Sequence, residues 1–314
     1  MKRSLKYGLT TALRSFEEPD VWDGQETIAV TGATVLADVF HEKQRMVTIG
    51  VPANAQGEVH IDRTIYGNCH THIVLGVESA ANITVIETLT GEGNLRSNTQ
   101  VSIGQQAKVK YTIIQALASQ SVALLHYEAQ TNNCALQWLF CGIGADTTQA
   151  YIGTKAGDNS EIENNAVIYG TGQQQFDIHV ATTHQGEHSK SNMLTRSVLD
   201  DRARAIYHGL IHIGPESAEC DSYQKDEVIL LSPTAGADAI PNLEIQNNRV
   251  RCSHGASIGK LDEEKLFYCK SRGVTEAQAK RMITEGFLFE LLPKELHKLI
   301  TAKAGGVHED DASQ

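Results

Sequence analysis

A thiol and an imidazole stand two residues apart in the last quarter of the chain, at Cys252 and His254. Side chains two apart on a β-strand share one face, so both would point the same way as Val250, Ala256 and Ile258. Thiolate sulfur and imidazole nitrogen are ligands for iron, copper or zinc. The spacing alone favours a simpler arrangement, a buried cysteine beside a hydrogen-bonded histidine.

A second thiol, Cys220, lies upstream in a polar and acidic segment. Its one nearby apolar residue is Ala218, whereas a buried cysteine behaves as a small apolar side chain and usually has apolar company. We therefore expect Cys220 to be accessible. Accessibility is what a thiol needs in order to accept sulfur or to bind iron.

The six cysteines show no C-x-x-C spacing, which argues against a zinc ribbon or a thioredoxin-like dithiol. In a reducing cytosol we expect free thiols, most of them buried. The sequence also lacks a Walker-type G-x-x-x-x-G-K-[ST], a complete G-x-G-x-x-G and an H-E-x-x-H motif. These enzyme signatures therefore assign no activity.

Among the thirteen histidines, three closely spaced pairs offer imidazoles to a metal: His70 with His72, His208 with His212, and His184 with His188. Each of the first two pairs would share one strand face, and for both we favour a solvated or hydrogen-bonded role. In the second pair that face lies opposite an apolar face set by Tyr207, Ile211 and Ile213. The third pair lies in a polar stretch, where a surface corner is favoured.

Composition excludes several partners. The 314 residues carry 27 Lys and Arg against 38 Asp and Glu, a net charge of −11, whereas nucleic-acid binding needs a basic stripe. No run of about eighteen apolar residues is present to span a membrane. The basic start of the chain is not followed by the apolar region of a secretory signal. We expect a cytoplasmic protein.

Short alternating apolar runs dominate residues 27–259, separated by turns rich in Gly, Asn, Asp and Ser. Period-two alternation is typical of strands with one buried face. So many short strands are compatible with a sandwich, a barrel or a solenoid. The 6% aromatic content and the frequent asparagines favour a β-helix with irregular rungs, whose narrow core takes Val, Ile, Leu and Ala.

The pattern after these strands is helical. Asp262 opens a helix, Thr275 begins a capping box for a second, and Pro293 marks a third. In the first helix Leu266, Phe267 and Tyr268 are consecutive and rotated by about 100 degrees from one another, so at least one should face outward. The expected parts are an N-terminal helix and linker (1–26), a β-helix core (27–259), a C-terminal helical domain (260–304) and a disordered tail (305–314).

Six segments between residues 182 and 289 form a specific combination: THQGEHSKS at 183–191, RAIYHG at 204–209, ECDS at 219–222, CSHGASIG at 252–259, LDEEKLFY at 261–268 and SRGV at 271–274. Together they resemble the SufB/SufD family of iron–sulfur cluster assembly scaffold proteins. The β-rich middle of the chain resembles that family only in its general pattern of short alternating strands and polar turns.

The resemblance implies a right-handed parallel β-helix followed by a small helical domain, dimerisation through the β-helices, and docking of a separate SufC-like ABC ATPase on the helical domain. It implies that Cys220, in a Cys-Asp-Ser motif of the SufB-like type, receives sulfur and helps hold a nascent iron–sulfur cluster. It implies that His254, in a Ser-His-Gly-Ala motif of the SufD-like type, contributes from the partner subunit. Cys252 is a further candidate metal ligand.

This chain departs from both types, because it combines the SufB-like thiol with a SufD-like Cys-Ser-His-Gly, where Gly255 replaces the glutamate of SufB-like members. One chain could thus take the roles of both the SufB-like and the SufD-like subunit in a homodimer. A heterodimer with another scaffold subunit is the alternative. The predicted function is a non-catalytic scaffold of the SUF system that works with an ATPase, a sulfur donor and apo iron–sulfur proteins. The alternative is a β-helix enzyme acting on a polysaccharide or an acyl group.

Overall fold

Parallel strands dominate the computed structural model, which describes residues 24–32 and 45–305. The expected N-terminal helix and the expected tail beyond residue 305 lie outside the described residues. The elements in chain order are β1 (Gln25–Gly32), β2 (Arg45–Val51), β3 (Gln56–Val77), β4 (Asn82–Ile103), β5 (Lys108–Gln115), β6 (Val122–Thr131), β7 (Ala135–Gly142), β8 (Thr147–Ala156), β9 (Glu161–Gly170), β10 (Gln175–His184), β11 (Lys190–Leu199), β12 (Arg204–Ile213), β13 (Asp221–Leu230), β14 (Gly236–Ile245), β15 (Arg251–Lys260), α1 (Glu263–Ser271), α2 (Glu276–Phe289), the 3-10 turn η1 (Lys294–Leu296) and α3 (His297–Gly305).

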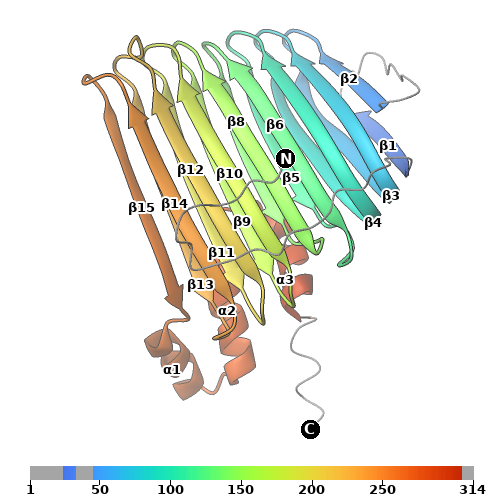
Figure 1. Ribbon diagram of the computed structural model, residues 1–314, viewed down its shortest axis with the longest axis vertical. Helices are drawn as coiled ribbons and strands as arrows, with labels where there is room; N and C mark the ends of the chain where they lie inside the picture. The colour runs from blue at the N-terminus through green and yellow to red at the C-terminus, as the bar shows by residue number, and fades with distance from the viewer. Residues whose placement is uncertain (1–23, 33–44, 306–314) are drawn as a thin grey trace.

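The strands wind into a β-solenoid of about eight turns, followed by the helices (Figure 1). Strands β6, β8, β10, β12 and β14 follow one another in what we call the even sheet, and β5, β7, β9, β11, β13 and β15 in the odd sheet. The long strand β4 joins the two, since its first half pairs with β5 and its second half with β6. Within the described residues every pairing is parallel except that of β1 with β3. The predicted β-helix with C-terminal helices is confirmed.

Alternation along each strand fills the inside of the solenoid with apolar side chains. In β10, Phe176, Ile178 and Val180 point inward and are buried, whereas Asp177 and His179 on the opposite face are only half-buried. Stacked turns bring Val, Ile, Leu and Ala side chains into one continuous core, which also holds large aromatic side chains such as Trp138, Tyr111 and Phe140. Burying an aliphatic side chain of this kind contributes about 1.5–3 kcal/mol, so the stacking of turns is the main source of stability.

One corner of successive turns holds a residue in the left-handed backbone region, with φ between 50° and 61°. These residues are Asn54, Ala80, Gln106, Asn133, Asn159, His188 and Glu219. Asparagine tolerates this region better than most non-glycine residues, which explains part of the asparagine enrichment. A cross-turn amide bond, Asn94 Nδ2 to Asn68 Oδ1 at 2.8 Å, explains another part.

Helices α2 and α3 pack on the outer face of the odd sheet, behind the strands in Figure 1. Their apolar residues, among them Leu288 and Ile300, contact the outward side chains of β7, β9 and β11. Arg196 of β11 anchors α2, because its guanidinium donates to the Phe287 carbonyl at 2.7 Å and pairs with Glu290 at 2.5 Å. The predicted helix start at Asp262 and the predicted capping box at Thr275 are both present, and Asp262 is the N-cap residue of α1. None of the described helices is long and apolar enough to cross a membrane.

Candidate functional site

Cys220 lies immediately before β13, on the face that points into the solenoid. Its side chain is 2% exposed and belongs to the main apolar core. The Sγ atom lies 3.2 Å from Ser189 Oγ and 3.5 Å from the Gly186 carbonyl oxygen. The expectation that this thiol is accessible is therefore wrong for the single chain. Its polar sequence neighbours are misleading, because its apolar surroundings come from other turns.

His184, at the end of β10, is fully buried and joins Cys220 to a small polar network. Its Nδ1 lies 2.6 Å from Ser189 Oγ, the same oxygen that contacts the Cys220 thiol. Its Nε2 lies 2.8 Å from Ser222 Oγ and 3.0 Å from Ser191 Oγ. Burial, together with the charge of His212, lowers the pKa of His184 to about 4, so the imidazole is neutral at pH 7. The predicted surface corner holds for the exposed His188 but not for His184.

The polar network joins an imidazole to a thiol through hydrogen bonds. A neutral imidazole carries one donor and one acceptor nitrogen, and a serine hydroxyl both donates and accepts. Ser189 stands between the Cys220 thiol and His184 Nδ1, within hydrogen-bonding distance of both. The Cys220 thiol, the Ser189 hydroxyl and the neutral His184 imidazole can therefore form one continuous hydrogen-bonded chain.

Cys252 and His254 lie on β15, the last strand of the odd sheet. Cys252 pairs in register with Ser222 and His254 with Gln224, so both side chains lie on the face that continues the interior of the solenoid. Cys252 is half-buried, and burial with the nearby charge of Asp221 raises the pKa of its thiol to about 11. His254 is exposed, because β15 is the final strand at this end.

Within one chain the three predicted ligands do not converge. Strands rise about 3.3 Å per residue and lie about 4.8 Å apart, so the Cα atoms of Cys220 and His254 are separated by about 14 Å. By the same reasoning the Cα atoms of Cys220 and Cys252 are about 8 Å apart. The ligand atoms of one metal ion lie within about 4–5 Å of each other, since metal–ligand bonds are about 2.0–2.3 Å long. Side chains of a strand stand roughly perpendicular to the sheet, so Cys220 and His254 of one chain, about 14 Å apart at their Cα atoms, are not placed to share an ion.

Comparison with known proteins identifies the family. Residues 61–287 match the family model described as "SUF system FeS cluster assembly, SufBD core domain". The chain belongs to the SufBD family. A SufBD family iron–sulfur cluster assembly protein of Mycobacterium tuberculosis is 25% identical over 284 residues, 86% of this chain and 70% of the relative. The iron–sulfur cluster assembly protein SufD of Bacillus subtilis is 25% identical over 279 residues, 85% of this chain and 62% of SufD.

The SufD of Escherichia coli is 31% identical over a shorter stretch of 135 residues, which is 43% of this chain and 32% of that protein. A role in iron–sulfur cluster assembly follows from this family membership.

Two further polar side chains of this SufBD-family chain point inward at the same end, at Gln224 and Asp226 of β13. Among the described residues neither carboxylate oxygen of Asp226 has a hydrogen-bond partner. Burial, with the charge of Glu227, raises the pKa of this carboxyl to about 7. The inward face of β13 is thus polar at three alternate positions, Ser222, Gln224 and Asp226.

Sequence reasoning considered His184 only in a pair with His188, for which it favoured a surface corner, and it passed over Ser189 and Asp226. The sequence did contain a clue to this polar interior. The alternate positions 222, 224 and 226 are polar, where a strand of this core should show apolar residues. His70 with His72, and His208 with His212, lie half-buried on the outer faces of β3 and β12, as predicted.

Proposed function

We propose that this chain is a scaffold subunit of the SUF machinery, and that two copies build a nascent iron–sulfur cluster between them. The observation behind the proposal is that Cys220 has a built hydrogen-bond path to His184 and yet lies about 14 Å from His254 of its own chain. A second chain that brings its own His254 to the first chain's Cys220 would complete the site. Iron and sulfide are the cargo, and thiolate and imidazole are suitable ligands for it.

The end of the solenoid supports the pairing of two chains. Strands β14 and β15 stand last in the even and odd sheets, so each has an edge without a neighbour among the described residues. Unpaired strand edges readily take up another strand. Ile245 and Ile258 on these two strands are 42% and 43% exposed, and a twofold partner would cover both. We therefore propose a homodimer joined at this end.

Pairing would also cover Cys252, which is half-buried in the single chain. Cys252 is the third proposed ligand, and its raised pKa means that a metal must displace its proton on binding. Sulfur would come from a separate donor, and the finished cluster would pass to apo iron–sulfur proteins. All six cysteines are free thiols, which suits a reducing compartment and a cytoplasmic protein.

Anaerobic reconstitution tests the proposal. The purified chain, supplied with ferrous iron and sulfide and then desalted, should retain both and absorb visible light. Cys220→Ser should lose most of the retained iron and sulfide, because a hydroxyl is a far weaker ligand than a thiolate. The replacement should preserve the fold, since Ser189 Oγ and the Gly186 carbonyl remain as hydrogen-bond partners.

Cys269→Ser is the matched control, because Cys269 is a half-buried thiol of α1 outside the proposed site. Circular dichroism of both variants checks their folding. A Cys220→Ser protein that is folded and retains as much iron and sulfide as the parent would remove Cys220 from the site.

We further propose that a SufC-like ABC ATPase docks on α1 and the adjoining part of α2. Phe267 and Tyr268 are 74% and 60% exposed, and Met282 of α2 is 57% exposed. Leu266, by contrast, is half-buried. The prediction that at least one of these three consecutive residues faces outward is therefore correct, because Phe267 and Tyr268 both do. Exposed large apolar side chains that gather on one small element mark an interaction site.

The double variant Phe267→Ser/Tyr268→Ser should weaken ATPase binding by about 30-fold or more, since losing even one well-buried aromatic anchor of an interface costs about 2 kcal/mol, which is about 30-fold in affinity. Isothermal titration with the purified ATPase measures the change. Tyr66→Ser is the matched control, because this 56% exposed tyrosine lies on β3, far along the solenoid. Equal affinities for parent and double variant would place the docking surface elsewhere.

The enzyme alternative has one sequence feature in its favour. Residues 255–259 read Gly-Ala-Ser-Ile-Gly, which matches the G-x-S-x-G pattern of serine hydrolases. That motif works at a sharp turn between a strand and a helix, whereas these residues all lie within β15. The scaffold proposal is therefore preferred.

A further inference from the structure

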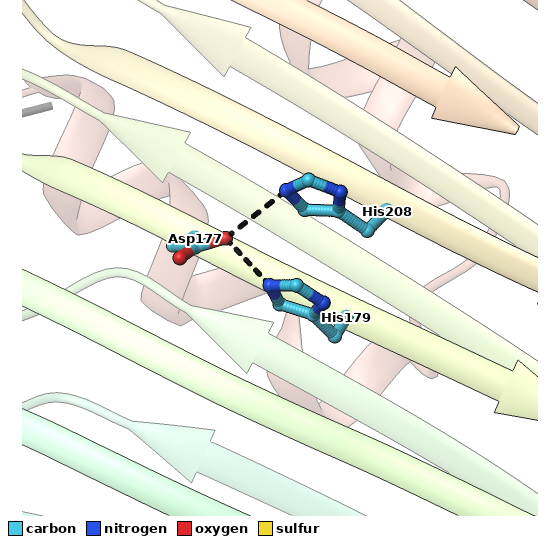
Figure 2. A group of neighbouring side chains, drawn as sticks. All are labelled: Asp177, His179 and His208. Atoms are coloured by element: carbon cyan, nitrogen blue, oxygen red, sulfur yellow. Dashed lines mark ion pairs between the residues drawn. The ribbon is translucent and has the colours of Figure 1, made fainter. Parts of the chain in front are cut away.

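The outer face of the even sheet carries a second cluster of potential metal ligands, separate from Cys220 and His254. Asp177 and His179 lie two apart on β10, and His208 faces them from β12 (Figure 2). His179 and His208 are register partners in adjacent parallel strands. Within the described residues this is the one group of three such side chains whose ligand atoms all lie within 4.8 Å of one another.

Both imidazoles aim the same nitrogen at the same carboxylate oxygen. Asp177 Oδ1 lies 2.9 Å from His179 Nε2 and 3.6 Å from His208 Nε2. Ligand atoms of a tetrahedral site with bonds of about 2.0–2.1 Å are about 3.3 Å apart, so the two observed distances bracket the required value. A small movement of side chains would complete three corners of a tetrahedron.

The arrangement of the two rings favours a cation between these groups. The rings of His179 and His208 are stacked, with centroids 4.1 Å apart and planes 10° from parallel. This stacking holds both Nε2 atoms side by side, facing Asp177 Oδ1 (Figure 2). A cation bound there would be coordinated by this oxygen and by both Nε2 atoms at once.

A simple aspartate–histidine ion pair explains less of the arrangement. It accounts for His179 at 2.9 Å but not for a second imidazole directed at the same oxygen. The other carboxylate oxygen of Asp177 accepts a hydrogen bond from Gln149 Nε2 at 3.0 Å, which leaves Oδ1 facing the two imidazoles. Hydrogen bonds of this kind orient metal ligands in known sites. The three strands that carry these side chains, β8, β10 and β12, are paired neighbours in the sheet.

We propose that Asp177, His179 and His208 bind a divalent transition-metal ion of the zinc, cobalt and ferrous class, with solvent completing the coordination. Two imidazoles and one carboxylate suit these ions and not calcium or magnesium, which prefer oxygen ligands alone. The three side chains are between 13% and 25% exposed, so an ion can enter from solvent. The site is independent of the proposed cluster site, since it uses none of the same residues.

The sequence could not reveal this group. His208 was considered with His212, four residues on in the same strand, whereas its partner in space is His179, 29 positions earlier (208 − 179) and one turn back. The same face continues with His126 and Tyr151, whose rings stack with centroids 4.7 Å apart. Those two rings lie on β6 and β8 and supply a control.

Cobalt titration of the metal-free full-length chain tests the proposal. Co²⁺ takes the same ligands as Zn²⁺ and absorbs visible light, which zinc does not. The titration uses a Cys220→Ser/Cys252→Ser background, so that neither thiol of the proposed cluster site contributes ligands or thiolate absorption. One equivalent of cobalt should bind with visible bands, and zinc should displace it.

His208→Gln and His179→Gln should each weaken cobalt binding by more than about 100-fold, because a lost direct ligand costs more than the 10–100-fold of a lost supporting residue. His126→Gln should bind cobalt like the parent, because His126 contacts Tyr151 and Glu128 but not this group. Zinc should raise the melting temperature of the parent and of His126→Gln but not of His208→Gln. Absence of cobalt binding by the parent, or equal affinity in His208→Gln, would overturn the proposal.

Discussion

A mixed dimer of one Cys220→Ser chain and one His254→Ala chain should regain one of the two cluster sites that each homodimeric variant lacks. If each site takes Cys220 from one chain and His254 from the other, the mixed dimer holds one intact site and one doubly altered site. Iron and sulfide retained per dimer should therefore rise from near zero to about half of the parental value. Differently tagged chains, purified over both tags, provide the mixed dimer for reconstitution.

The expected recovery follows from the register of β13 and β15. Gln224 is opposite His254, and Cys220 lies four residues before Gln224, which sets the separation of about 14 Å. If the ligands instead belonged to one chain, the mixed dimer would contain two singly broken sites and recover nothing. The outcomes are thus opposite for the two arrangements.

A matched mixture guards against a general effect of mixing. In a dimer of two Cys220→Ser chains that carry different tags, both Cys220 thiols are absent. The iron and sulfide retained by this dimer should stay near zero. A chain that is monomeric under all conditions, or a mixed dimer as empty as its parents, would contradict a shared site. Size-exclusion chromatography with light scattering distinguishes these two results.

The solenoid could be predicted because its rules are local. Alternation such as Phe176, Ile178 and Val180 marks an inward face without knowledge of the partner strands. Turn residues with positive φ, Asn133 and Asn159 among them, mark the corners. The helix starts at Asp262 and Thr275 depend on side chains within three residues. Each of these features is decided by neighbours in sequence.

The environment of the candidate site could not be predicted, because it depends on residues about one turn away. Cys220 has polar neighbours in sequence, yet stacking places it against Ser189 of the preceding turn and inside the core. His184 sits in a polar stretch and is buried because its side chain falls on the inward face of β10. Such contacts depend on the number of residues that separates equivalent positions in successive turns, and this number varies along the irregular solenoid.

At the opposite end of the solenoid, Arg63→Leu should destabilise the protein by about 3–5 kcal/mol, the usual cost of breaking a buried ion pair. Arg63 is 1% exposed and reaches two buried carboxylates. Its Nε lies 2.6 Å from Glu26 Oε1 and its NH1 lies 2.6 Å from Glu87 Oε1. Although burial opposes the charge, the two carboxylates raise the pKa of Arg63 above its ordinary value. The guanidinium is therefore charged at any accessible pH.

The cost arises from what the substitution leaves behind. Glu87 still accepts hydrogen bonds from Tyr111 at 2.9 Å and Tyr127 at 3.0 Å, but two carboxylates would remain in the core without a positive charge. Desolvated charges of this kind are far more costly than the lost packing of one side chain. Thermal unfolding should therefore begin at this end, with a melting temperature lower by about 5–15 °C.

Neutral replacement of the acids tests this cause. In the triple variant Arg63→Leu/Glu26→Gln/Glu87→Gln no charge remains, and the amide oxygen at position 87 can still accept from the two tyrosines. Much of the lost stability should return, because exchanging a whole buried ionic group for neutral residues is often close to neutral. Urea denaturation of parent, single and triple variants measures the three free energies of unfolding. A triple variant as unstable as Arg63→Leu would show that the packing of the arginine, and not the charge of its partners, holds this end together.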